Sequence, residues 1–145
     1  MREGSLNPTA TQKAIRILGI CVLVGILIYF LTKNNAGISI AVKDDHLSLS
    51  YPSEASVTIN YKDILSVNKR GNLNPGKYVS GIDTKNYKFG VWENGEFGKY
   101  HLCIYADVEQ YIVVKTSTEI FVFNFENVDA TDSFYKAFTE LLQTK

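Results

Sequence analysis

Apolar and polar residues alternate with a period of two along most of the chain after residue 37. Residues 38–42 and 47–51 follow this pattern on either side of Asp44-Asp45, so they are expected to form a hairpin with one buried face. The same period predicts further strands at residues 57–61, 64–67, 87–91, 100–105, 111–115 and 120–125. A kink is expected at Lys62-Asp63.

Residues 68–86 interrupt this alternation. They are polar and rich in glycine, so they are predicted to form the longest loop, with a short strand near Tyr78-Val79. Further along, Asn94-Gly95 suits a tight hairpin turn because both residues tolerate positive φ. Within residues 100–105, alternate side chains are expected to face opposite sides of the sheet.

From Asp129 onward the period becomes helical, and Asp129 or Thr131 can cap the start of the helix. One face of this helix carries Phe134, Phe138, Leu141 and Leu142. Since a short helix is unstable alone, that face is expected to close the open end of a curved sheet. The predicted fold is mainly β, with about seven antiparallel strands in a partly open barrel, capped by the C-terminal helix, over residues 38–145.

Residues 14–32 form an apolar run that is uncharged between Ile17 and Leu31. As a helix these residues would span roughly 28 Å, close to the hydrocarbon thickness of a bilayer. Twelve of them are Leu, Ile, Val or Phe, which contribute about −4 to −7 kcal/mol toward insertion. The run is therefore predicted to be a single transmembrane helix, with contact to the bilayer through residues 14–32.

Two alternatives to an anchor remain, a buried helix of a soluble protein and a cleaved signal peptide. The residues after the run, 33–36, do not form a cleavage site of small residues. Residues 1–13 are polar and are expected to be a flexible tail, with residues 33–37 as a linker. Arg2, Lys13 and Arg16 precede or begin the run, so the positive-inside bias places the N-terminus in the cytoplasm and the domain outside the cell membrane.

Composition excludes several classes of protein. The chain has 145 residues and a formal net charge of zero. That length supports one domain with a short appendage. Because the charges balance, there is no bulk attraction to nucleic acid, and no nucleic-acid partner is expected.

The residues that could carry catalysis or bind a metal are few. His46, His101, Cys21 and Cys103 are too few and too scattered for a zinc site, and no serine has the glycines of a nucleophile elbow. A calcium site at Asp107-Val108-Glu109 is less favoured than an ordinary solvated loop. No cofactor, metal or catalytic residue is predicted.

Charge is distributed unevenly along the chain. Residues 62–88 hold six bases and two acids, a net of +4, whereas residues 93–145 hold four bases and nine acids, a net of −5. The six bases are candidates for contact with an anionic surface: Lys62, Lys69, Arg70, Lys77, Lys85 and Lys88. An ordinary solvated loop explains the same pattern. Tyr87, Trp92, Phe97 and Tyr100 surround the Asn94-Gly95 turn, where cross-strand packing is favoured over an exposed patch.

Three segments carry a resemblance to a known family. They are residues 61–67 (YKDILSV), residues 85–90 (KNYKFG) with the hairpin to 105, and residues 111–116 (YIVVKT) before the last strand and helix. Over residues 37–143 the chain resembles the pleckstrin-homology (PH) superfold, and within it the bacterial PH-like domains that follow membrane segments. Many of these have two preceding membrane helices, whereas this chain has room for one.

The resemblance implies a binding or assembly module that contacts a protein or envelope component, or a second copy of itself, and is not an enzyme. Eukaryotic relatives often bind phosphoinositides through bases in the first hairpin turn. Here that turn reads Lys43-Asp44-Asp45-His46, and two carboxylates repel a phosphate, so this site is not expected. The alternatives are binding of a small ligand in a cavity lined by tyrosines (Tyr51, Tyr61, Tyr87 and Tyr105) and, least favoured, an enzyme. A core filled by Phe134 and Phe138 would argue against the cavity.

Overall fold

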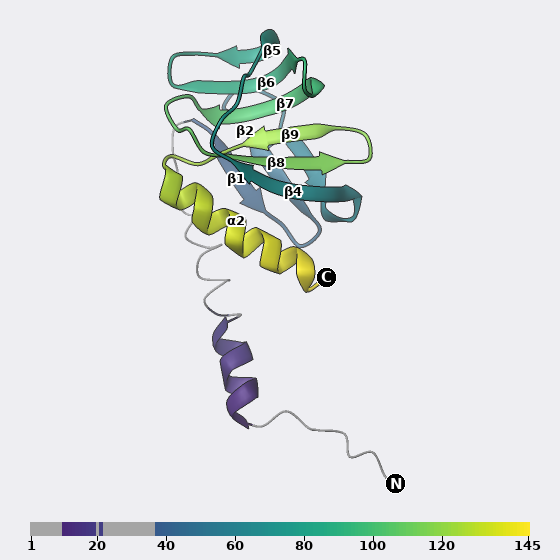
Figure 1. The fold of residues 1–145 in the computed structure, drawn as a ribbon, viewed down its shortest axis with the longest axis vertical. Coiled ribbons are helices and arrows are strands. Elements are labelled where there is room, and N and C mark those ends of the chain that lie inside the picture. The colour runs from purple at the N-terminus through teal and green to yellow at the C-terminus, as the bar shows by residue number, and fades with distance from the viewer. Residues whose placement is uncertain (1–9, 20, 22–36) are drawn as a thin grey trace.

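The computed structural model describes residues 10–19, 21 and 37–145. Residues 37–145 form two sheets and one long helix (Figure 1). The first sheet is antiparallel and has the order β1-β2-β3, with β1 at Ser39–Val42, β2 at His46–Ser50 and β3 at Val57–Asn60. The predicted first hairpin is confirmed, since Ile40 pairs with Leu49 across it.

The second sheet has six strands in the order β4-β8-β9-β7-β6-β5. Their bounds are β4 Ile64–Arg70, β5 Lys77–Asp83, β6 Tyr87–Asn94, β7 Gly98–Tyr105, β8 Tyr111–Thr116 and β9 Ile120–Phe123. A 3-10 helix, η1 (Tyr61–Asp63), takes the chain from β3 into β4 at the predicted kink. Helix α2 (Val128–Gln143) follows the last strand.

The predicted architecture is correct in its class and wrong in two details. The described residues form nine strands where about seven were expected, and these strands lie in two sheets that form no closed barrel. One pair, β7 with β9, is parallel where an all-antiparallel arrangement was expected. This parallel pair arises because β9 returns antiparallel to β8 and then enters the sheet between β8 and β7.

The predicted long loop over residues 68–86 is largely strand. Strand β4 extends to Arg70 and β5 begins at Lys77, so only residues 71–76 connect them. The alternation fails here because β5 is an edge strand, with residues 77–80 all exposed. The turn after β6 also differs, since residues 95–97 form it and the positive φ lies at Gly98 (+67°).

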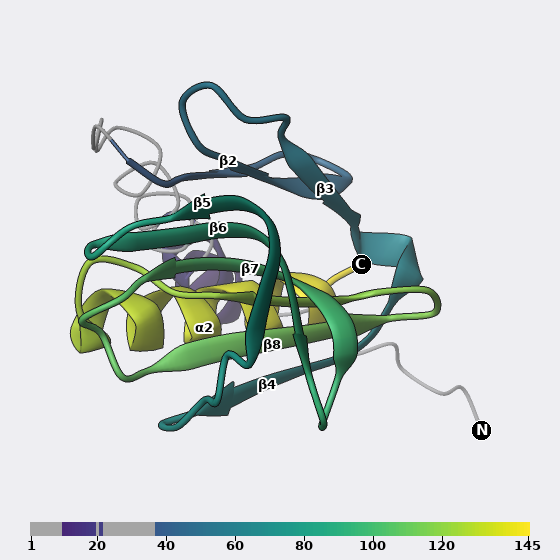
Figure 2. The same ribbon diagram turned by 90° about the horizontal axis from the view of Figure 1, so that it is seen from above.

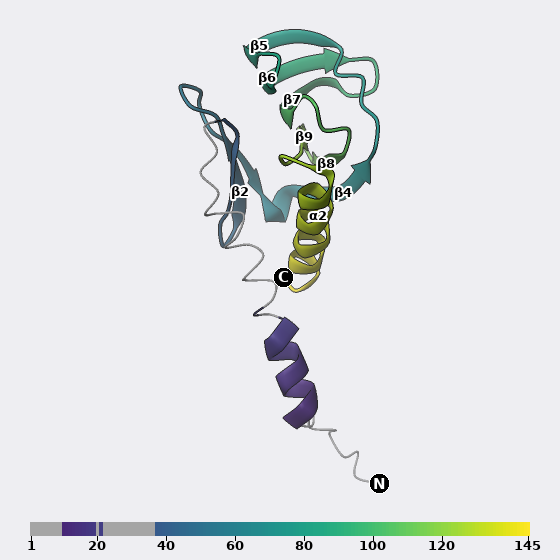
Figure 3. The same ribbon diagram turned by 90° about the vertical axis from the view of Figure 1, so that its left-hand side faces the viewer.

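The main core lies between the two sheets and is closed at one end by α2 (Figure 3). Its fully buried members include Leu47 from the first sheet, Ile112 from the second, and Phe134 and Phe138 from the helix. The predicted apolar face of the helix is confirmed. Its N-cap is Asn127, whose side chain accepts a hydrogen bond from the Ala130 amide (2.7 Å), and not Asp129 or Thr131.

A second apolar cluster lies on the opposite face of the six-stranded sheet. Trp92 and Tyr100 pair across β6 and β7 and are each 2% exposed. The connection from β4 to β5 passes over this face, and the Tyr100 hydroxyl donates to the Pro75 carbonyl oxygen (2.8 Å). Figure 2 shows this connection crossing the sheet between its two edges. The alternate residues of β7 thus lie on opposite faces of the sheet, as predicted, and each face packs into its own apolar cluster.

Asn124 joins the end of β9 to the turn after β7 and is fully buried. Its side-chain oxygen accepts from the Tyr105 amide (2.7 Å), and its NH₂ group donates to the carbonyl oxygens of Tyr105 (3.2 Å) and Val108 (3.0 Å). Asn124→Ala would remove these three hydrogen bonds from a fully buried position, so we expect a loss of about 2 kcal/mol in unfolding free energy, measured by urea denaturation. Asn68→Ala, at an exposed position, is the control; equal losses in both variants would contradict this role.

Residues 10–19 and 21 are helical, and the side chains of Ile15, Ile17 and Leu18 are each more than 60% exposed. This helix begins within the segment that was expected to be a polar tail. In the part of the chain that the structure describes, no helix has the length and apolarity needed to cross a membrane. Most of the predicted membrane helix, namely residue 20 and residues 22–32, lies outside the described residues, as do residues 1–9 of the tail and 33–36 of the linker.

Candidate functional site

Strand β5 ends the six-stranded sheet on one side, and it pairs only with β6 among the described residues. Two apolar side chains on it are partly exposed, Tyr78 (43%) and Val79 (40%). Tyr78 is held in place because its ring packs edge-on against Trp92 (5.3 Å between centroids) and its hydroxyl donates to the Gly81 carbonyl oxygen (2.9 Å). The strand therefore presents a backbone edge with a fixed aromatic side chain beside it.

The pairing of β5 with β6 depends on two glycines that face each other, Gly81 and Gly90. Their φ angles are +112° and +134°, in the region that favours glycine. A Cβ on Gly81 would lie 2.1 Å from the Phe89 carbonyl oxygen, and a Cβ on Gly90 would lie 2.2 Å from that of Ser80. The two backbones can approach this closely only because neither residue has a side chain.

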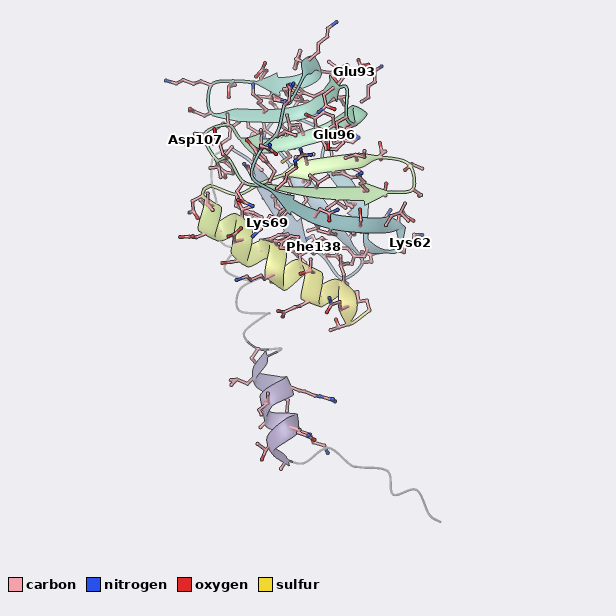
Figure 4. The ribbon with its side chains drawn as sticks, in the orientation of Figure 1. Lys62, Lys69, Glu93, Glu96, Asp107 and Phe138 are labelled. Atoms are coloured by element: carbon pink, nitrogen blue, oxygen red, sulfur yellow. The ribbon has the colours of Figure 1, made fainter. Side chains whose placement is uncertain are left out.

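The six predicted basic residues do not form one surface. Lys69 bonds to Asp132 (2.8 Å) beside the start of α2, whereas Lys62 lies in η1 near the end of that helix (Figure 4). Strands β4 and β5, which carry Lys69 and Lys77, are at opposite edges of the sheet.

Three of the six bases are paired within the domain. Besides Lys69, Arg70 binds Glu96 (2.7 Å) and Lys88 binds Asp83 (2.5 Å). Lys62, Lys77 and Lys85 have no ion pair with any described residue. Contact of the six bases with an anionic surface stays a prediction.

Among the surface hollows formed by the described residues, two lie beside the sheets. One, of about 410 Å³, lies where the tip of the β6–β7 hairpin approaches β4 and β8, and it is lined by Arg70, Glu96, Phe97 and Lys115 among others. Arg70 is already bonded to Glu96 and lies over the Phe97 ring. These contacts hold the hairpin tip against β4, so the Arg70 charge is not available to a ligand in this hollow.

The other hollow, of about 480 Å³, lies between the first hairpin turn, η1 and the end of α2. It is lined by Asp44, Asp45, Asn60, Tyr61, Lys62, Leu142 and Lys145. In the turn, Asp45 accepts a hydrogen bond from His46 (2.6 Å), which lowers the pKa of this exposed carboxyl group. The acidic turn can be recognised in the sequence, but the hollow cannot, because its walls come from three segments far apart in the chain.

The tyrosines that were considered for a ligand cavity pack against other aromatic rings. Tyr87 contacts Tyr51 and Tyr105, with centroids 5.9 and 5.3 Å apart, and Tyr61 contacts Phe138 at 5.8 Å. Phe134 and Phe138 are fully buried between the sheets. The interior is therefore filled by side chains at the position where a small ligand would bind.

The remaining candidates for chemistry have structural partners. His101 stacks on Phe121 and bonds through Nε2 to Glu119 (3.0 Å). Cys103 is buried, which strongly raises the pKa of its thiol and makes it unreactive. Asp107 is exposed in a turn (Figure 4). Among the described residues, no three His, Cys, Asp or Glu side chains lie close enough to hold a metal ion.

The buried phenol groups of Tyr61 and Tyr100 are expected to make the stability of the folded state depend on pH under alkaline conditions. Burial raises the pKa of both Tyr61 and Tyr100 to about 12, from an ordinary value of 10.0. Above pH 10 the unfolded chain loses these protons while the folded chain keeps them, so the folded state becomes less stable as pH rises from about 10 to about 12. We expect Tyr61→Phe and Tyr100→Phe each to flatten this fall in urea unfolding measured at stepped pH; an identical slope in wild type and both variants would contradict it.

Comparison with known proteins agrees with this architecture. A family model for the bacterial PH domain matches residues 38–138, which covers both sheets and most of α2. No curated protein and no solved structure matches the chain. PH domains are in general non-catalytic interaction modules. Two sheets closed by a C-terminal helix, together with this match over more than half of the chain, show that the protein belongs to the bacterial PH domain family.

Proposed function

We propose that this protein is a non-catalytic interaction module, held at a membrane by residues 14–32, that binds a protein partner along the free edge of β5. The single observation that carries the proposal is that edge. Its central residues, 78–82, are uncharged, while Lys77 and Asp83 mark its two ends. An extended segment of a partner can add as a further strand there, with backbone hydrogen bonds for affinity and side-chain contacts for specificity.

The opposite edge of the same sheet is less available. Lys69 of β4 reaches Asp132 on α2, and its ammonium group lies 5.6 Å from the Tyr135 ring centroid. Arg70, at the end of β4, is bonded to Glu96. These side chains cross from the strand to neighbouring elements, whereas residues 77–80 of β5 are all exposed.

A photo-crosslinking amino acid at position 79 tests the partner-binding edge in living cells. We expect a discrete adduct from Val79 and none from Lys99, which is also exposed but lies on the interior strand β7. The charged variant Val79→Glu should abolish capture from a crosslinker placed at Ser80. Absence of an adduct at position 79, or the same adducts from positions 79 and 99, would refute the edge as the site.

Support for the anchor comes from the sequence, where residues 17–31 carry no charge. Alkaline carbonate should leave the full-length protein in the membrane pellet. Release into the soluble phase would show that there is no anchor.

We propose that the domain lies outside the cell membrane, because the bases before the apolar run favour a cytoplasmic N-terminus. In a Cys21→Ser background, a cysteine at position 99 should react with a membrane-impermeant maleimide in intact cells. Labelling only after lysis would place the domain on the cytoplasmic side and refute the orientation.

A further inference from the structure

The hollow beside the first hairpin turn already holds a cation from this chain. The Lys145 ammonium group lies 5.3 Å from the centroid of the Tyr61 ring and donates a hydrogen bond to the Asp44 carbonyl oxygen. About 480 Å³ of open space adjoins this lysine, within the range of about 300–1,000 Å³ that is usual for ligand pockets.

The aromatic wall of the hollow is fixed in position. Tyr61 is only 9% exposed, its hydroxyl donates to the Lys43 carbonyl oxygen (2.7 Å), and its ring packs against Phe138. A ring that is immobilised before binding needs no ordering when a cation arrives, so the contact costs little conformational entropy.

The charges that line the hollow suit a cation. Asp44 and Asp45 contribute −2, and Lys62 and Lys145 contribute +2. When Lys145 leaves, two acids and one base remain, a net of −1. An ammonium or guanidinium group that entered would meet the Tyr61 ring, the freed Asp44 carbonyl oxygen and two carboxylates, and Leu142 would contact its aliphatic stem.

We propose that this hollow binds a lysine or arginine side chain from a basic segment of a partner polypeptide, and that Lys145 occupies the position until that segment displaces it. The occupant is a side chain because Lys145 already shows how one fits, with its ammonium group on the Tyr61 ring and the Asp44 carbonyl oxygen. This site lies on the first hairpin turn, η1 and the end of α2, so it is independent of the β5 edge.

The test uses the full chain in non-ionic detergent and the peptide acetyl-Ala-Lys-Ala-amide, with binding followed by the NMR signal of the Asn60 side-chain amide. In the wild type the peptide can bind only while Lys145 is away from the Tyr61 ring, which weakens its apparent affinity. Lys145→Met removes this competition and should tighten binding about tenfold if Lys145 occupies the position nine-tenths of the time. Lys136→Met, at an exposed lysine of the same helix, should leave the affinity unchanged.

Two further measurements check the chemistry. The double variant Asp44→Asn, Asp45→Asn changes two exposed residues and should weaken binding at least about fivefold, since it removes both carboxylates. The norleucine analogue of the peptide, which keeps the stem without the charge, should not bind. The proposal is overturned if Lys145→Met leaves the affinity unchanged, if the norleucine peptide binds equally, if the peptide fails to bind, or if calcium chloride shifts the Asn60 signal while the peptide does not.

Discussion

Replacing Phe138 by alanine is expected to lower the unfolding free energy by about 3–5 kcal/mol. Phe138 is fully buried, stacks on Phe134 (5.5 Å between centroids) and supports the Tyr61 ring (5.8 Å). The cost combines the lost burial of an aromatic ring with the cavity that it leaves, because helix and sheets cannot all move inward to fill it. Urea unfolding followed by fluorescence of the single tryptophan, Trp92, measures the loss.

Leu65→Ala is the control for this experiment. Leu65 is 73% exposed on β4, so its truncation should change the unfolding free energy by no more than about 0.5 kcal/mol. A loss of less than about 1 kcal/mol in Phe138→Ala would mean that α2 does not close the core.

Gly90→Ala is expected to cost about 3 kcal/mol. The new Cβ would lie 2.2 Å from the Ser80 carbonyl oxygen, and the φ of +134° is one that alanine rarely adopts. Because the neighbouring group is backbone, it cannot swing aside, and β5 must separate from β6. Urea unfolding reports the loss, and faster hydrogen exchange at the amides of β5 should report the separation.

Gly95 provides a matched glycine. A Cβ there meets no atom within 4 Å, and its φ is not in the region that requires glycine. Gly95→Ala should therefore leave both stability and exchange nearly unchanged. If the two alanine variants behave alike, the close approach at Gly90 does not determine the pairing of β5.

Local periodicity predicted the elements in which apolar side chains are buried on one face and polar side chains are exposed on the other. Leu47 and Leu49 alternate with polar residues because one face of β2 is buried, and the helical spacing of Phe134 and Phe138 follows from the core beneath α2. Strand β5 was predicted only as a short strand near Tyr78-Val79, because an exposed edge imposes no alternation that would show its full length. The N-cap was assigned wrongly because Asn127, Asp129 and Thr131 are all residue types that cap helices, and the backbone geometry selects between them.

Strand order and surface sites depend on contacts between distant segments, which no local pattern contains. The parallel pairing of β7 with β9 is one example. The basic residues are another: Lys69 and Lys77 are close in sequence, but the strands that carry them lie at opposite edges of the sheet. The hollow beside Tyr61 needs residues near positions 44, 60 and 142 at once, so its acidic turn alone did not reveal it.

The placement of β4 and β5 at opposite edges constrains the order of events during synthesis. Strand β4 pairs with β8, which leaves the ribosome only after β5, β6 and β7 have been made. The first sheet emerges earlier still, and its apolar face is covered only when the second sheet and α2 have followed. The nascent chain must therefore keep a hydrophobic sheet uncovered through most of translation, which makes it a candidate client for chaperones that bind at the ribosomal exit tunnel.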